Sequence, residues 1–279
     1  MSAGTSKRGS IAIYLAFALI LLFFALPLLW LLSLAVRTPA EIFVAEVRII
    51  PRAPTLGNFA TILQNPQFLV YLWNGLKLSI AGAAGACLVA APAAYAFSRF
   101  QFRGKSRLLF ALLGFQMISP LVIMVPLYRY MRALGLTEIQ FGAALVYAAI
   151  SAPIATWILK GTFDAIPREF EEAAMIDGCS RWQAFVLIIL PVCVPGLAST
   201  FILTAMLGWS QFMVPFILLS QPSMLPISVG IFNFLGAYTG SATQLVAAAS
   251  ILSLLPAIAI FVIFQRFVVG ALTAGALKE

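Results

Sequence analysis

Long apolar stretches alternate with shorter polar segments along the whole chain. A transmembrane α-helix needs about 20 consecutive residues that are mainly apolar, and six stretches reach this length. They lie at about residues 11–36, 75–97, 108–128, 139–159, 192–219 and 245–269. The pattern predicts an all-α polytopic membrane protein with six transmembrane helices, and a single transmembrane domain over residues 1–279.

The basic residues predict the orientation of these spans. With both termini in the cytoplasm, eleven of the 17 Lys and Arg residues fall on the inner side and six on the outer side. Cytoplasmic loops carry an excess of Lys and Arg, so this orientation is favoured over its reverse. It places segments 37–70 and 221–243 outside and segment 164–191 in the cytoplasm.

Composition narrows the chemistry that the chain can perform. Of its 279 residues, 62% are hydrophobic and 9% are charged, so the net charge of +8 reflects topology and the membrane surface. We therefore predict a bilayer environment and no nucleic-acid partner. The sequence has no His, which excludes imidazole metal ligands and Ser/His or Cys/His catalytic pairs. We predict no metal site and no catalytic residue.

Charged groups in mid-membrane usually mark ion or proton pathways. No Asp or Glu falls inside a predicted span, and the basic residues of the spans lie near their ends: Lys77, Arg129, Arg132, Lys160 and Arg266. A proton- or sodium-coupled carrier normally needs an intramembrane acid. The energy for transport is therefore expected to come from another subunit.

One connection between spans is acidic and ordered by local signals. Residues 164–177 contain five acids and a single Arg. Pro167 suits the first turn of a helix, and the acids that follow favour the positive end of the helix dipole. Gly178 can end this helix because Gly accepts the left-handed conformation, and Ser180 with Gln183 forms a capping-box pattern. The stretch predicts helix, sharp turn, helix: a compact acidic element suited to docking another protein.

The spacing inside this segment also resembles a known motif. Glu172-Ala173-Ala174, then Gly178, then Ile188 and Leu190-Pro191 match the EAA loop of ABC-importer permeases. The chain is similar to the carbohydrate branch of that family, the type found in maltose, trehalose and glycerol-phosphate importers. The similarity covers essentially the whole chain and includes segments 93–97, 126–128 and 271–278. It implies the type I ABC-importer permease fold with six transmembrane helices.

The resemblance also implies a set of partners. A second homologous permease would pair with this chain as a heterodimer, in the cytoplasmic membrane of a bacterium or archaeon. Two ATPase subunits would hold ATP-Mg, and this chain would bind no cofactor of its own. An extracytoplasmic solute-binding protein would deliver the substrate, a sugar or sugar-like solute.

The resemblance assigns roles to two parts of the sequence. Coupling to the ATPase would be carried by Glu171, Glu172, Ala173, Ala174, Asp177 and Gly178. Glu171 or Glu172 would meet basic residues of the ATPase. Segment 221–243 looks like the loop that reaches into the binding protein in maltose-type permeases, and Asn233 and Tyr238 are its candidate contacts.

Neutral polar and aromatic residues within the spans are candidates for the substrate path: Gln116, Tyr147, Trp209, Gln211 and Phe212. Aromatic faces combined with amide and hydroxyl groups suit a neutral polyhydroxylated ligand. Each of these residues is also explained as a contact between helices, and that alternative stays open. Related permeases commonly have Trp-Asn-Glu-Phe at 209–212, where this chain has Ser210 and Gln211. An anionic substrate also stays open, with Lys77 or Arg129 as contacts.

Two other classes of function remain alongside the ABC permease. The first is an ion-coupled secondary transporter or channel without an ATPase partner, which the missing intramembrane acids disfavour. The second is a membrane-embedded enzyme, which is disfavoured because the sequence offers no cluster of Asp, Glu, His or Cys for chemistry.

Overall fold

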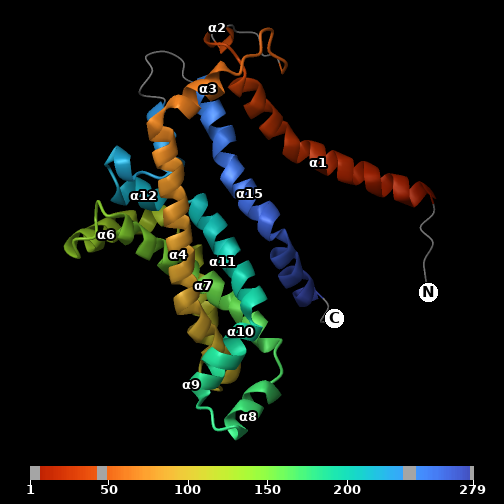
Figure 1. Cartoon of the computed structure of the whole chain (residues 1–279), viewed down its shortest axis with the longest axis vertical. Helices are drawn as coiled ribbons and strands as arrows, with labels where there is room; N and C mark the ends of the chain where they lie inside the picture. Colours follow the sequence, from red (N-terminus) through yellow and green to blue (C-terminus); the bar gives the residue numbers. More distant parts are fainter. Residues whose placement is uncertain (1–6, 43–48, 235–242, 277–279) are drawn as a thin grey trace. The chain divides into compact units, whose positions relative to one another are not determined.

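The structure is a computed structural model that describes residues 7–42, 49–234 and 243–276. Every regular element in these ranges is a helix, as predicted (Figure 1). The chain forms two compact units. Unit 1 comprises Met1–Phe68 and Ile231–Leu254, and unit 2 comprises Leu69–Gly230 and Leu255–Glu279.

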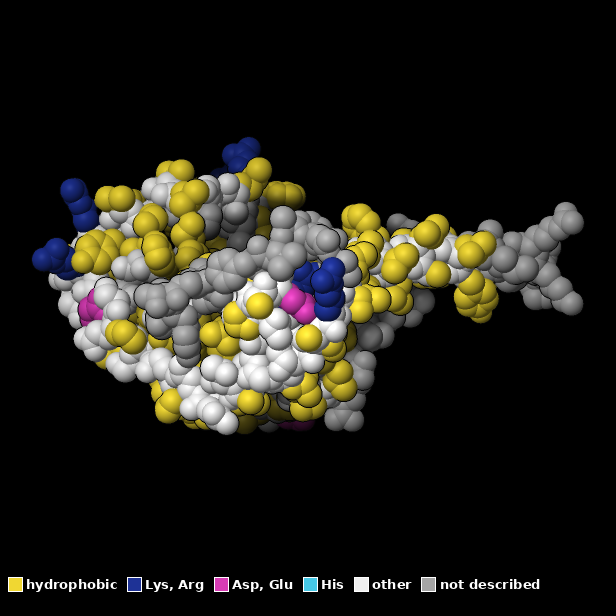
Figure 2. All heavy atoms as spheres, turned by 90° about the horizontal axis from the view of Figure 1, so that it is seen from above, with side chains coloured by type: hydrophobic (Ala, Val, Ile, Leu, Met, Phe, Trp, Pro, Cys, Tyr) yellow, Lys and Arg dark blue, Asp and Glu magenta, His cyan; other side chains and the backbone are white. Residues whose placement is uncertain are grey.

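Unit 1 begins with a long apolar helix. Its elements are α1 (Lys7–Ala35), α2 (Pro39–Ile42) and α3 (Gly57–Gln64). The part of α1 over Ile13–Ala35 is a candidate membrane span, and hydrophobic side chains cover its visible face (Figure 2). The buried Asn58 side chain donates to the carbonyl oxygens of Ala35 and Arg37, each at 2.8 Å. Segment 37–70, predicted as a loop, therefore contains ordered short helices.

Unit 2 holds most of the remaining helices. In chain order they are α4 (Pro66–Arg99), α5 (Lys105–Gly114), η1 (Phe115–Met117), α6 (Pro120–Ala133), α7 (Gln140–Asp164), α8 (Glu169–Ile176), α9 (Arg181–Ala184), η2 (Phe185–Ile189), α10 (Leu190–Val192), α11 (Val194–Trp209), α12 (Met213–Leu218), η3 (Pro222–Met224) and α13 (Ile227–Gly230). The last helix, α15 (Thr243–Ala276), starts in unit 1 and ends in unit 2.

Helices α4 and α7 lie side by side and run in the same direction. Lys77 Nζ donates to Gln140 Oε1 at 3.1 Å near their beginnings, and Ser98 Oγ donates to Asp164 Oδ1 at 2.6 Å where both helices end. We call the end with Arg99 and Asp164 the α8 end of unit 2, and the opposite end the η3 end. Figure 1 shows α8 beyond the lower end of α4.

Because α4 and α7 run in the same direction, segment 105–133 must connect opposite ends of unit 2. The chain leaves α4 at the α8 end and enters α7 at the η3 end, so α5, η1 and α6 together must cross the unit once. They do so with a bend of 98° between Lys105–Met117 and Leu121–Ala133. The third predicted span, 108–128, is therefore not one continuous helix. Ile118 and Ser119 both lie outside the helical region. For Ser119 the cause is Pro120, because a residue that precedes Pro is disfavoured in the helical region.

Helix α11 returns across unit 2 in the direction opposite to α7. Gly196, near its start, packs against Thr162, and Gly208, near its end, packs against Ser79. A bend of 75° separates Arg181–Val192 from α11, and η2 widens the helix just before it as a π-helix. Four helices are long and apolar enough to cross a membrane, and six candidate spans result when each bent pair is counted as one, in line with the six helices of the predicted fold.

The predicted fifth span, 192–219, is also interrupted. Helix α11 ends at Trp209 and α12 begins at Met213. The described part of segment 221–243 then folds into η3 and α13, and residues 225–227, 229 and 230 are buried. The sequence predicts this segment as an external loop that resembles the binding-protein loop of maltose-type permeases. Its described part is inserted against α4, where a Cβ on Gly230 would lie 2.4 Å from the ring of Tyr71.

Candidate functional site

The acidic segment folds as its local signals predict. Helix α8 carries Glu169, Glu171 and Glu172 in its first turn, and Gly178 follows it with a φ of 91°. Gly178 N donates to Met175 O at 3.1 Å, and Cys179 N donates to Ala174 O at 3.0 Å. These bonds form the left-handed helix end that glycine permits. The predicted turn at Gly178 is confirmed.

The predicted capping box at the start of α9 is also confirmed. Gln183 N donates to Ser180 Oγ at 3.3 Å, and Ser180 N donates to Gln183 Oε1 at 2.8 Å. Both helix ends of the turn are therefore closed by hydrogen bonds. Helix α8 and the turn that follows it therefore form an ordered structure rather than an irregular loop.

The predicted coupling residues divide between the two faces of α8. Glu171 is 9% exposed and Ala174 is 7% exposed, so both face the interior of unit 2. Glu172, Ala173, Asp177 and Gly178 are exposed. Of the two neighbouring glutamates, only Glu172 is therefore accessible from outside unit 2.

Glu171 is instead held by helix α4. Tyr95 donates its hydroxyl to Glu171 Oε2 at 2.9 Å, and the Nε of Arg99 forms an ion pair with Glu171 Oε1. Arg99 Nη2 also donates to Ile166 O at 3.0 Å. Arg99 is one of the eleven basic residues that the predicted orientation places on the inner side, and no further role is predicted for it from the sequence. Its spacing of four residues from Tyr95 on one helix face was the available signal.

A second charged contact lies beside the first at the α8 end. Asp164, the last residue of α7, accepts a hydrogen bond from Ser98 Oγ and forms an ion pair with Lys160 one helical turn earlier. Ser98 and Arg99 are neighbours in sequence. The end of α4 therefore contacts both the end of α7 and the start of α8.

Three of the five substrate-path candidates converge on one cavity of about 240 Å³ beside the middle of α7. They are Gln116, Tyr147 and Gln211. The cavity is lined by Gln116, Tyr147, Ile150, Ser151, Ile154, Leu207, Gly208, Ser210 and Gln211. These residues come from η1, α7, α11 and the break after α11. The lining contains amides, hydroxyls and one aromatic ring, and no charged side chain.

Hydrogen bonds join this cavity to the inserted segment. The backbone oxygen of Gln211 accepts from Tyr147 Oη at 3.3 Å and from Ser228 Oγ at 2.8 Å. Ser228 belongs to α13. The break between α11 and α12 thus supplies a carbonyl group that a continuous helix would use internally, and this carbonyl ties α7 to α13 at the edge of the cavity.

The other two path candidates do not line the cavity. Trp209 packs against Gly75 of α4, where a Cβ would lie 3.3 Å from its ring. Phe212 stacks on Phe216 with ring centroids 5.1 Å apart. Both residues therefore have packing roles. The binding-protein candidate Asn233 is exposed, and Tyr238 lies outside the described residues.

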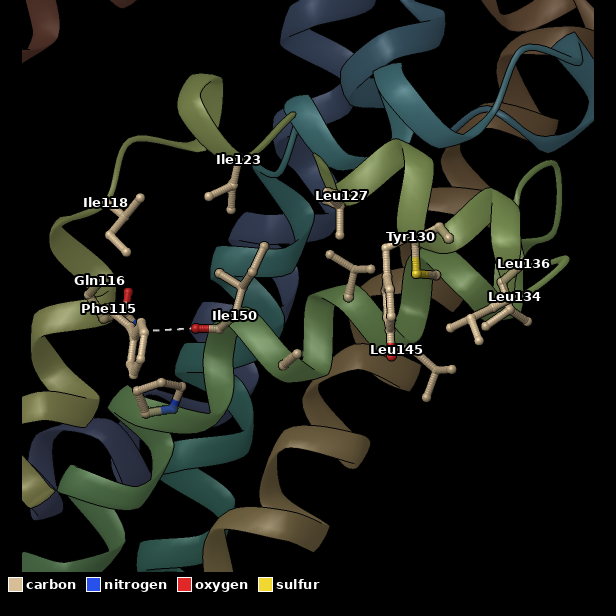
Figure 3. A pocket seen from close by; sticks show the side chains of 14 residues that line it. Phe115, Gln116, Ile118, Ile123, Leu127, Tyr130, Leu134, Leu136, Leu145 and Ile150 are labelled. Carbon is tan, nitrogen blue, oxygen red and sulfur yellow. Dashed lines mark hydrogen bonds between the residues drawn. The ribbon is translucent and has the colours of Figure 1, made fainter. Parts of the chain in front are cut away.

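A larger cavity of about 540 Å³ lies between η1, α6 and α7 (Figure 3). Its lining is almost wholly apolar and includes Ile123, Leu127 and Leu145. Gln116 touches both cavities and donates from Nε2 to Ile150 O at 2.9 Å. The smaller cavity is the better match for a polyhydroxylated ligand, because polar groups fix the orientation of such a ligand.

Comparison with known proteins identifies the family. The profile described as "Binding-protein-dependent transport system inner membrane component" matches residues 82–273. The chain belongs to this family. It is a multi-pass inner-membrane permease subunit of a binding-protein-dependent transport system, and it is not itself an enzyme.

Curated relatives resemble the permease over nearly its full length. It is 31% identical to the sulfoquinovosyl glycerol transport system permease protein SmoH of Agrobacterium fabrum, over 95% of this chain and 93% of that protein. It is 33% identical to the trehalose transport system permease protein SugB of Mycobacterium tuberculosis, over 91% and 92% of the two chains.

A solved structure shares the fold of the permease. This is a chain of a bacterial ABC transporter involved in the import of the acidic polysaccharide alginate, with a TM-score of 0.76 and 22% sequence identity. The match covers 95% of this permease and 98% of that chain. The predicted ABC-importer permease fold and the predicted permease function are confirmed.

Proposed function

We propose that this permease forms half of the translocation path for a sugar or sugar-like solute. The observation that carries the proposal is the convergence of Gln116, Tyr147 and Gln211 on one uncharged polar cavity. Amide and hydroxyl groups match the hydrogen-bonding groups of a carbohydrate, and an aromatic ring offers its apolar face. The names of the two curated relatives, which transport trehalose and sulfoquinovosyl glycerol, support the same substrate class.

The energy for transport comes, in this proposal, from ATPase subunits that dock on the exposed face of α8. Glu172 and Ala173 lie on that face, next to the turn at Gly178. A carboxylate beside a small side chain allows a basic partner residue to approach closely. Two ATPase subunits hold ATP-Mg, a second homologous permease completes the path, and an extracytoplasmic binding protein delivers the solute. The α8 end and both termini face the cytoplasm.

A charge reversal at Glu172 tests the docking face. In Glu172→Lys we expect uptake to be abolished in proteoliposomes that contain the whole transporter, and the ATPase to be lost on co-purification. The variant should still insert into the membrane in normal amounts, because Glu172 is exposed. Arg103→Glu is the matched control, since it also reverses an exposed charge, outside α8. Normal uptake by Glu172→Lys would contradict the proposal, as would uptake by this chain alone without ATP.

A further inference from the structure

The Arg99–Glu171 ion pair is buried although it lies at the end of a membrane protein's helix bundle. The side chains of Arg99 and Glu171 are only 7% and 12% exposed. Removing two charges from water is costly, and apolar residues of similar size often hold a fold as well. What the ion pair adds is a fixed geometry, because a guanidinium group binds a carboxylate in a defined direction.

Several side chains at the end of α4 bind the acidic segment. Arg99 binds Glu171 on α8 and also the carbonyl of Ile166, which precedes α8. Ser98 binds Asp164 at the end of α7. Tyr95 binds the second oxygen of Glu171. Because these contacts come from neighbouring turns of one helix, α8 cannot shift along or away from α4 without breaking them.

Helix α4 also forms part of the packing around the cavity. A Cβ on Gly82 would lie 2.5 Å from the Cβ of Tyr147, so α4 touches the cavity-lining residue of α7 directly. Gly208 of α11 lies against both Ser79 and Tyr147. From residue 82 to residue 99 is 17 residues, or about 26 Å of helix at 1.5 Å per residue. Helix α4 therefore connects the residues that bind α8 with the residues that pack against Tyr147 at the cavity.

The route from the C-terminal end of α8 to the cavity runs through α9, η2, α10 and α11. It contains the left-handed turn at Gly178, the π-helix of η2 and a bend of 75°. Turns, π-bulges and bends are the places where helices deform. Helix α4 covers the distance between α8 and the cavity as one helix, Pro66–Arg99, with Pro92 inside it, and α7 covers it as one helix, Gln140–Asp164, with Pro153 inside it.

We propose that Arg99 and Glu171 are positioning residues that transmit the displacement of α8 to α4 and so to the cavity wall at Tyr147. This inference rests on the proposed docking of an ATPase on α8. Glu172 makes the external contact, while its neighbour Glu171 carries the movement inward. Tyr95 holds the Glu171 carboxylate in the orientation that Arg99 requires.

The test is the number of ATP molecules hydrolysed per solute imported by the reconstituted full transporter. The variants are Arg99→Lys and Glu171→Gln, which keep most of the side-chain volume. Lys cannot reproduce the geometry in which Arg99 binds Glu171 from Nε and Ile166 O from Nη2, because its ammonium group lacks the planar fork of Arg. We expect the ATPase to co-purify normally and the ATP-to-solute ratio to rise about tenfold or more, a typical size for coupling between two sites. Arg103→Lys is the matched control and should leave the ratio unchanged.

A charge exchange separates coupling from simple structural support. The double variant Arg99→Glu, Glu171→Arg restores an ion pair between α4 and α8, and its ATP-to-solute ratio should fall back toward that of the wild type. Unchanged ratios in Arg99→Lys and Glu171→Gln would overturn the inference. Failure of the docking proposal gives a different result, namely ATPase retention and normal uptake in Glu172→Lys.

Discussion

The two ends of the α4–α7 pair bind neighbouring segments through different kinds of contact. One end binds α8, and the other binds residues 220–225. At the α8 end, the contacts are mainly between side chains, and the central contact is the ion pair between Arg99 and Glu171. At the η3 end, side chains bind mainly backbone groups of residues 220–225. A contact between two side chains depends on the identity of both residues, whereas a contact between a side chain and a backbone group depends on the identity of only one.

The η3 end shows this second kind of contact clearly. Asn74 Nδ2 donates to Ser223 O at 2.8 Å and to Leu225 O at 3.1 Å. Gln140 Nε2 donates to Met224 O at 3.0 Å. A backbone carbonyl is present whatever residue carries it. The inserted segment can therefore change in sequence and keep its place.

The α8 end should accordingly be the more sensitive to single substitutions. In Arg99→Ala or Glu171→Ala, the remaining partner is a buried charge without its counter-ion, and we expect a loss of about 3–5 kcal/mol in the free energy of unfolding. Denaturant unfolding of the detergent-solubilised permease measures this loss. The double variant Arg99→Met, Glu171→Leu removes both charges and should recover most of it. Equal losses in the single and double variants would show that the charges are not the cause.

The η3 end should respond less strongly. Asn74→Ala removes two hydrogen bonds and leaves two carbonyl groups unpaired, which costs about 1–3 kcal/mol. We expect faster amide hydrogen exchange over residues 220–226. Ser223→Ala is the matched control, because it changes the accepting residue and keeps its carbonyl, and exchange should stay at the wild-type rate. A large effect of Ser223→Ala would mean that the side chain of Ser223, and not its backbone, holds the segment.

The sequence predicts features whose causes are local. The turn at Gly178 and the capping box of Ser180 follow from residues within one or two helical turns, and the structure confirms both. The break before Pro120 had a local signal as well, because Pro constrains the residue before it. It was missed because hydropathy alone does not register backbone geometry.

Features that depend on distant residues were not predictable in this way. Glu171 and Glu172 are chemically identical neighbours. Glu171 faces inward because it binds Arg99, which lies 72 residues earlier in the sequence. The residues that line the cavity also depend on distant contacts. Tyr147 and Gln211, 64 residues apart in the sequence, meet there. Trp209, only two residues before Gln211, packs against α4 instead. Hydropathy could nominate these residues but could not distinguish the cavity-lining ones.

The smallest expected effect concerns an acidic contact at the η3 end. Glu138, between α6 and α7, accepts hydrogen bonds from Ser220 N at 2.8 Å and Ser220 Oγ at 2.7 Å. The bond from the Ser220 backbone holds the pKa of the Glu138 carboxyl below its usual range. A lowered folded-state pKa stabilises the fold above the unfolded pKa of about 4.3, and this contribution is lost as the pH falls through the folded value.

Glu138→Gln should therefore destabilise the permease at pH 7 by less than about 1 kcal/mol, because the carboxylate is largely solvated. The difference from the wild type should shrink as the pH is lowered toward 4 and below, since protonated Glu138 then resembles Gln. Thermal unfolding of both proteins at pH 7 and at acid pH measures this difference. A gap that widens on acidification would show that the neutral form of Glu138, rather than its carboxylate, makes the contact. The contrast with Arg99 and Glu171 would then rest on burial alone and not on charge.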